Sequence, residues 1–182
     1  ENADFGSGVD KGVTILTGAS PGQVILNGNL TLTSNDTFPI EIDGVDPLTE
    51  YDNWVVAGIV TLNNATLLTS GSITTVGGNQ LMLIDNDGSD PVNGIFNGYS
   101  EGAVVSVSGL NYRITYSGGD GNDVVLSADT LVSLDVSGNL VITDIFTNTN
   151  DNLTISFDGV NYTITDPGRL IGTTVPGSTG DG

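Results

Sequence analysis

Short apolar segments that alternate with turns of Gly, Asn and Asp run through this chain and constrain its fold more than any other feature. Residues 83–126 show the pattern best: NGYSEG precedes the strand candidate VVSVS, and SGGDGN follows the strand candidate YRITY. Val, Ile, Thr and Tyr favour strands, whereas Gly, Asn and Asp favour tight turns. Helix formers are scarce. The sequence therefore predicts an all-β fold without a helix of ordinary length.

The strand candidates fit two arrangements. Continuous apolar runs, as in residues 54–60, suit a coil whose turns stack in parallel, whereas strict alternation, as in LTLT, suits antiparallel sheets. Gly28 and Asn29, which separate VILN from LTLT, form either a corner of the coil or a hairpin turn. We expect a parallel β-helix-like (β-solenoid) body through Gly94, closed by an antiparallel hairpin over residues 103–126. A β-sandwich is the alternative.

The sequence predicts a domain boundary at Ala128. Residues 1–128 form the β-helix-like domain, residues 129–170 form a small β-hairpin or sandwich module, and residues 171–182 form a flexible tail or linker. The module contains DGVNYTITD, which shares its frame with SGLNYRITY in the first domain. Two β-hairpins of similar build would explain this echo.

Acidic residues far outnumber basic residues. The chain has 22 Asp and Glu against three Lys and Arg, which gives a formal net charge of −19. Such a charge repels phosphate backbones and anionic membrane surfaces. We therefore expect no nucleic-acid partner. No run of about 18 apolar residues is present, so we also expect no membrane insertion. No basic, apolar leader stands at the start, so we expect a processed or excised piece.

The chain contains no Cys and no His. Disulfides, thiolate metal sites and triads with an imidazole base are therefore excluded. Arg113 and Arg169 lie in or beside strand patterns without an acidic constellation that the sequence identifies, and no pair of carboxylates is marked by its context. We predict that the protein is not an enzyme, with a polysaccharide lyase or hydrolase as the remaining alternative.

Few aromatic residues are available to stack on sugars. Trp54 lies within an apolar run, which predicts a role in the core. Tyr51 and Tyr99 lie in turn-rich contexts and are the candidates for exposed rings. Surface glycans are therefore an alternative partner, supported by two aromatic residues.

Three motifs follow one another in the second third of the chain: IDNDGSD at residues 84–90, GIFNGYSEG at 94–102 and YRITYSGGDGNDVVL at 112–126. Their order resembles the closing segment of the passenger repeats in giant bacterial surface adhesins of the autotransporter and planctomycete types. YDNWVVAGIVTLNNATLL at 51–68 resembles the same repeats, and residues 153–166 resemble modules that alternate with them. The resemblance implies a parallel β-helix or a related all-β rod that works outside the cell.

Two acidic turns are candidates for calcium. GGDGNDVVL at residues 118–126 matches the calcium-binding nonapeptide, which holds the ion when tandem copies stack, and a lone copy is more typical of a hairpin turn. DNDGSD at residues 85–90 supplies hard oxygen ligands but lacks the closing Glu of a helix-flanked calcium loop. An Asx-rich turn is favoured there too. We expect either no cofactor or Ca²⁺. The candidate ligands are Asp85, Asp87, Asp90, Asp120 and Asp123.

These observations predict an extracellular structural or adhesive module at a bacterial cell surface. It would self-assemble through its termini with copies of itself into a filament, or form one repeat of a giant adhesin. The alternative is a calcium-stabilised module that binds carbohydrate or another surface. The candidate assembly residues are Phe5, Val9, Val13, Leu170, Ile171 and Val175.

Overall fold

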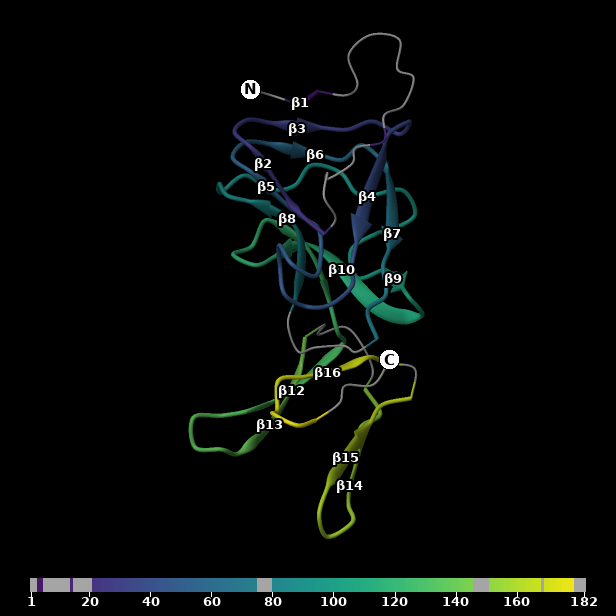
Figure 1. Cartoon of the computed structure of the whole chain (residues 1–182), viewed down its shortest axis with the longest axis vertical. Coiled ribbons are helices and arrows are strands. Elements are labelled where there is room, and N and C mark those ends of the chain that lie inside the picture. The colour runs from purple at the N-terminus through teal and green to yellow at the C-terminus, as the bar shows by residue number, and fades with distance from the viewer. Residues whose placement is uncertain are drawn as a thin grey trace.

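A computed structural model describes residues 3–4, 14, 21–74, 80–145, 151–167 and 169–178 of the chain. All regular secondary structure in these residues is β, and the sheets mix parallel with antiparallel strands. The predicted all-β fold is confirmed. Figure 1 shows a long molecule with β1 near one end and two hairpins at the other.

Strands of the N-terminal part pair in parallel in three sheets. The first sheet contains β2 (Gln23–Leu26), β5 (Asn53–Val56) and β8 (Leu81–Asn86). The second contains β1 (Ala3–Asp4), β3 (Leu30–Thr31) and β6 (Val60–Thr61). The third contains β4 (Thr37–Glu41) and β7 (Thr66–Ser70). Gln23 lies opposite Asn53, 30 residues later. Leu30 lies opposite Val60, and Thr37 lies opposite Thr66. The chain therefore visits the three sheets in turn and then returns to the first.

Gly28 and Asn29 form a corner between sheets, because β2 and β3 pair with different strands. The Asn29 side chain helps to hold this corner: its Oδ1 accepts a hydrogen bond from the Ile59 N–H at 2.9 Å, one coil further along. Asn63 does the same in the opposite direction, donating from Nδ2 to the Leu32 carbonyl oxygen at 2.9 Å. Asn side chains at these corners thus satisfy backbone groups that lie 30 and 31 residues away in the chain.

Antiparallel strands complete the first sheet, whose order is β2-β5-β8-β11-β10-β9. They are β9 (Val104–Val107), β10 (Leu110–Gly118) and β11 (Asp123–Ser127), and they lie where the sequence predicts an antiparallel hairpin. Ser108 and Gly109 both have positive φ and join β9 to β10 in a two-residue turn, the geometry typical of a tight hairpin.

One continuous apolar core fills the interior between the sheets. Phe38 packs against Trp54 and Phe96 with ring centroids 5.2 and 5.5 Å apart, which confirms the predicted core role of Trp54. The prediction that Tyr51 is exposed is wrong: the ring is buried and its hydroxyl oxygen accepts a hydrogen bond from the Met82 N–H at 3.4 Å. Tyr99 is half-buried against the same core.

The C-terminal part carries two further sheets. Their strands are β12 (Thr130–Leu134), β13 (Leu140–Asp144) and β16 (Ile171–Thr173) in one, and β14 (Thr154–Phe157) and β15 (Tyr162–Thr165) in the other. β16 runs parallel to β12, although the sequence places residues 171–173 in a flexible tail. β14 and β15 form a hairpin whose residues are mostly exposed. Both halves of the sequence echo are therefore hairpins.

Candidate functional site

Two acidic turns meet at the end of the first sheet, because β8 and β11 are neighbours. Asp123 Oδ1 accepts a hydrogen bond from the Asn86 N–H at 2.8 Å, and its Oδ2 accepts one from the Asp120 N–H at 3.2 Å. Asn122 ties the turns together, since its Nδ2 lies 2.9–3.0 Å from the carbonyl oxygens of Asn86, Gly88 and Asp90. The nonapeptide-like segment thus forms the turn between β10 and β11 and continues into β11.

Burial of carboxylates, together with repulsion between them, characterises this acidic turn. Burial and the neighbouring carboxylates of Asp87 and Asp120 raise the pKa of Asp85. Burial also raises the pKa of Asp123, while the hydrogen bonds from Asn86 and Asp120 act in the opposite direction. The side-chain oxygens Asn86 Oδ1, Asn122 Oδ1 and Asp90 Oδ2 are buried without a hydrogen-bond partner.

No cluster of three or more Asp or Glu able to hold a metal ion occurs in the described part of the chain. The structure brings Asp85, Asp87, Asp120 and Asp123 within electrostatic range of one another. Asp90 joins the network through its backbone carbonyl oxygen. Calcium binding at these residues stays a prediction.

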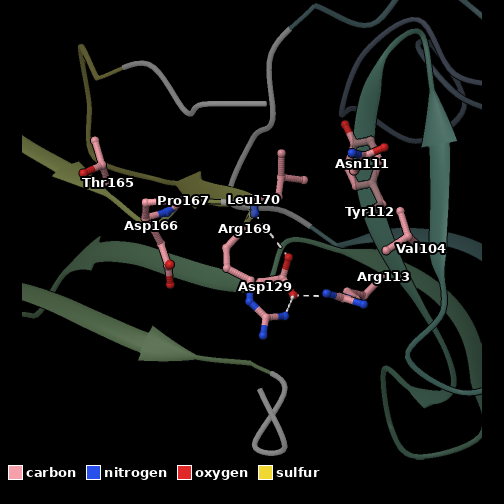
Figure 2. Close-up of a pocket in the computed structure, with 10 residues that line it drawn as sticks. All are labelled: Val104, Asn111, Tyr112, Arg113, Asp129, Thr165, Asp166, Pro167, Arg169 and Leu170. Carbon is pink, nitrogen blue, oxygen red and sulfur yellow. Dashed lines mark hydrogen bonds and ion pairs between the residues drawn. The ribbon is translucent and has the colours of Figure 1, made fainter. Parts of the chain in front are cut away.

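A second polar centre forms where β11 leads into β12. Asp129 Oδ1 accepts hydrogen bonds from Arg113 Nε at 2.7 Å and from Arg169 Nη1 at 3.2 Å, and Asp129 Oδ2 accepts one from the Leu170 N–H at 3.2 Å. Figure 2 shows the carboxylate between the two guanidinium groups. Arg113 comes from β10, whereas Arg169 precedes β16. The ion pairs therefore join the first sheet to the C-terminal part.

A cavity of about 380 Å³ opens beside these ion pairs. Its wall is formed by residues from β9, β10 and the segment around β15 and β16: Val104, Asn111, Tyr112, Arg113, Asp129, Thr165, Asp166, Pro167, Arg169 and Leu170. Arg113 and Arg169 are the two basic residues of the described part, and both line this cavity. The cavity therefore gathers both described arginines, each of which is paired with Asp129.

Two buried polar atoms of the cavity wall have no hydrogen-bond partner: the hydroxyl oxygen of Tyr112 and Oδ2 of Asp166. Tyr112 is 2% exposed and Asp166 is 4% exposed. Burial raises the pKa of Tyr112 to about 12, so its hydroxyl is protonated at neutral pH and able to donate. Asp166 Oδ1 accepts a hydrogen bond from the Asn152 N–H at 3.1 Å. A buried polar group without a partner costs free energy, and neither atom is exposed to the cavity.

The candidate assembly residues divide into two groups. Phe5, Val9 and Val13 lie outside the described residues. Leu170 and Ile171 are buried in the chain itself, and Ile171 pairs with Thr130 between β16 and β12. Val175 is half-buried. Near these residues, the β14–β15 hairpin exposes more apolar surface than they do. The sequence analysis did not identify this hairpin as an assembly surface.

The sequence contains a pattern that predicts this surface. Large apolar residues alternate with Ser or Thr at Ile155, Phe157, Tyr162 and Ile164. Ile155 pairs with Ile164, and Phe157 pairs with Tyr162, so the four side chains share one face of the hairpin. Ile155 is 54% exposed, Phe157 is 55% exposed and Tyr162 is 64% exposed. We call these four residues the hairpin apolar face.

Comparison with protein-family models, with curated proteins and with solved structures finds no match. The argument for function therefore depends on the geometry of this chain. Among the described residues, no helix is long and apolar enough to cross a membrane.

Proposed function

We propose that this protein is an extracellular structural module at a bacterial cell surface, built on a β-solenoid and joined end to end with copies of itself. The proposal depends mainly on the spacing between paired residues of neighbouring parallel strands. Paired residues lie about 30 positions apart in the chain in all three sheets. A coil of this kind transmits load along backbone ladders and needs no disulfide, which suits a chain without Cys. The resemblance to adhesin passenger repeats supports the surface location.

Both ends of the long axis favour assembly. At one end, β2 pairs with β5, and no described strand pairs with its other edge. An unpaired edge offers backbone groups to a strand from another chain. At the other end lies the hairpin apolar face, on a two-stranded hairpin that is marginally stable in water by itself. Contacts between two different ends propagate into an open filament.

The net charge makes assembly sensitive to salt. Copies that each carry −19 repel one another, and the repulsion is screened as the ionic strength rises. We expect longer assemblies in high salt and monomers in low salt. The opposite trend would contradict assembly through apolar contacts.

Negative-stain microscopy and sedimentation velocity test the proposal. The unmodified chain should form end-to-end rods at high salt, and Phe157→Asp, on the hairpin apolar face, should leave monomers with unchanged thermal unfolding. Leu68→Asp is the matched control, because Leu68 is similarly exposed but lies on β7, along the side of the molecule. Compact monomers at every salt concentration, or rods that survive Phe157→Asp, would show that assembly does not use this end.

The calcium-stabilised module is the second candidate, and the raised pKa values of Asp85 and Asp123 favour it. A divalent cation would offset both the burial of these carboxylates and the repulsion between them, which together raise the pKa values. Adding Ca²⁺ should then raise the melting temperature, and Mg²⁺ at the same concentration should raise it less. Equal effects of both ions would indicate general screening and no calcium site.

A further inference from the structure

The apolar core is incompletely covered where the first sheet begins. Val24 and Leu26 of β2 pack against the core but are only partly buried. Their partners in β5, Trp54 and Val56, are 3% and 0% exposed. In the second sheet, Leu30 of β3 lies beside β1 and is fully buried. The core therefore lacks a covering strand next to β2.

The backbone of β2 has one free edge. N–H groups of β5 and of the residue after it donate to the carbonyl oxygens of Gly22 and Leu26. Because successive residues of a strand direct their backbone groups to opposite edges, those of Gln23 and Ile25 face away from β5. No described strand pairs with this edge, and β2 contains neither a charged residue nor Pro to block it. The edge is therefore open to another strand.

The β14 strand repeats the residue pattern of the first sheet. β2 reads Gln-Val-Ile-Leu and β5 reads Asn-Trp-Val-Val, each with core-packing residues at its second and fourth positions. β14 reads Thr-Ile-Ser-Phe, which places Ile155 and Phe157 at the same two positions. Both side chains are more than half exposed, and no described strand pairs with the second edge of β14. β14 thus offers the edge and the side chains that would complete the sheet next to β2.

Placement and charge favour a contact between different copies of the chain. Figure 1 shows the β14–β15 hairpin and β2 toward opposite ends of the molecule, so the hairpin meets β2 of another copy. None of β2, β14 and β15 contains a charged residue, which limits the repulsion between copies that each carry −19. A contact between two different ends also leaves both outer ends free for the next copies.

We propose that β14 of one copy adds to the free edge of β2 of the next copy as a parallel strand. Ile155 then lies beside Val24, and Phe157 lies beside Leu26, so that the incoming side chains cover the open end of the core. In strand addition of this kind, main-chain hydrogen bonds give affinity and alternate side chains give specificity. This inference rests on the proposed end-to-end assembly and names the two strands and the register that join the copies.

Disulfide cross-linking tests the register, because the chain has no Cys of its own. The register places Ser156 opposite Ile25, and both side chains are exposed on the face away from the core. Paired strands lie about 4.8 Å apart, which brings opposite Cα atoms within disulfide range. When Ile25→Cys chains are mixed with Ser156→Cys chains at high salt under mild oxidation, we expect linked dimers that a reductant separates.

Gln23→Cys mixed with Ser156→Cys is the matched control. Gln23 is also exposed on β2 but lies two residues out of register, which puts its Cα atom more than about 7 Å from that of Ser156 and out of disulfide reach. This mixture should stay unlinked, and thermal unfolding of each variant checks that the fold is intact.

The outcomes separate this pairing from end-to-end assembly in general. Rods in which both mixtures link equally, or in which neither links, would overturn the pairing of β14 with β2 and leave end-to-end assembly standing. Dimers formed by Ile25→Cys chains alone would indicate a symmetric contact and would also overturn the pairing. If the unmodified chain forms no rods at any salt concentration, both the pairing and the proposed function are wrong.

Discussion

The N-terminal part of the described chain, residues 21–74 and 80–127, and the C-terminal part, residues 129–145, 151–167 and 169–178, are both built from short strands, yet they bury their side chains very differently. Strands of the N-terminal part carry alternating buried residues that meet in one core, as in β4 and β9. The strands β13, β14 and β15 are exposed along nearly their whole length. The same residue types therefore form a large core only where several sheets face one another.

The two parts also close their turns in different ways. In the coil, Asn29, Asn63 and Asn122 bond to the backbone of a neighbouring coil or turn. In the hairpins, Asp135 and Asp158 accept hydrogen bonds from N–H groups of their own turns. Long-range bonds make the coil cooperative, whereas local bonds leave each hairpin to form and open independently.

The largest expected effect comes from replacing a ring in each part. Phe38→Ala should lower the free energy of unfolding by about 3–5 kcal/mol, because it leaves a cavity between Trp54 and Phe96. Phe157→Ala should change the unfolding of the coil by less than about 0.5 kcal/mol, since the ring is exposed. Chemical denaturation followed by Trp54 fluorescence measures both. Equal losses would show that the two parts unfold as one unit.

Asp129→Asn tests the connection between the parts. The neutral amide leaves two guanidinium groups without their carboxylate, and we expect a loss of about 2 kcal/mol, reduced because both arginines are partly exposed. Hydrogen exchange of β12 and β16 amides should rise more than that of β5 amides. Asp87→Asn, at an exposed turn, is the control. Uniformly faster exchange in all strands would contradict a local joint.

A comparison of turns has a smaller expected effect. Asn122→Ala removes three hydrogen bonds to carbonyl oxygens of the neighbouring turn and should cost about 1 kcal/mol of global stability. Asp135→Ala should raise amide exchange within β12 and β13 alone, because its bonds stay inside one turn. Asn97→Ala, at an exposed turn, controls for loss of an Asn side chain. If Asn122→Ala frays only its own turn, the coil is less cooperative than its contacts indicate.

Sequence patterning was enough to predict the all-β class, the core position of Trp54 and the place of the antiparallel hairpin, because each depends on alternation or turn residues within a short window. The burial of Tyr51 was missed because its partner, the Met82 N–H, comes from the next coil. The cluster of Arg113, Asp129 and Arg169 was also missed. It depends on the parallel pairing of β12 with β16 across a long insertion, for which local patterning gives no signal.

The smallest expected effect concerns the acidic turn and tests whether burying the Asp85 carboxylate beside other carboxylates lowers the stability of the fold. The folded-state pKa of Asp85 is raised above its usual value of 3.8, so ionisation of Asp85 destabilises the fold, and the cost appears as the pH rises through the folded-state pKa. Asp85→Asn should therefore be more stable than the unmodified chain at pH 7, by about 0.5 kcal/mol or less because solvent screens the charge. The difference should vanish below about pH 4. Asp46→Asn supplies the same change of charge outside the cluster, and urea denaturation across this pH range compares the three. A stabilisation that persists in acid would assign the effect to packing, and a loss of stability at pH 7 would mean that the Asp85 carboxylate is needed for the turn.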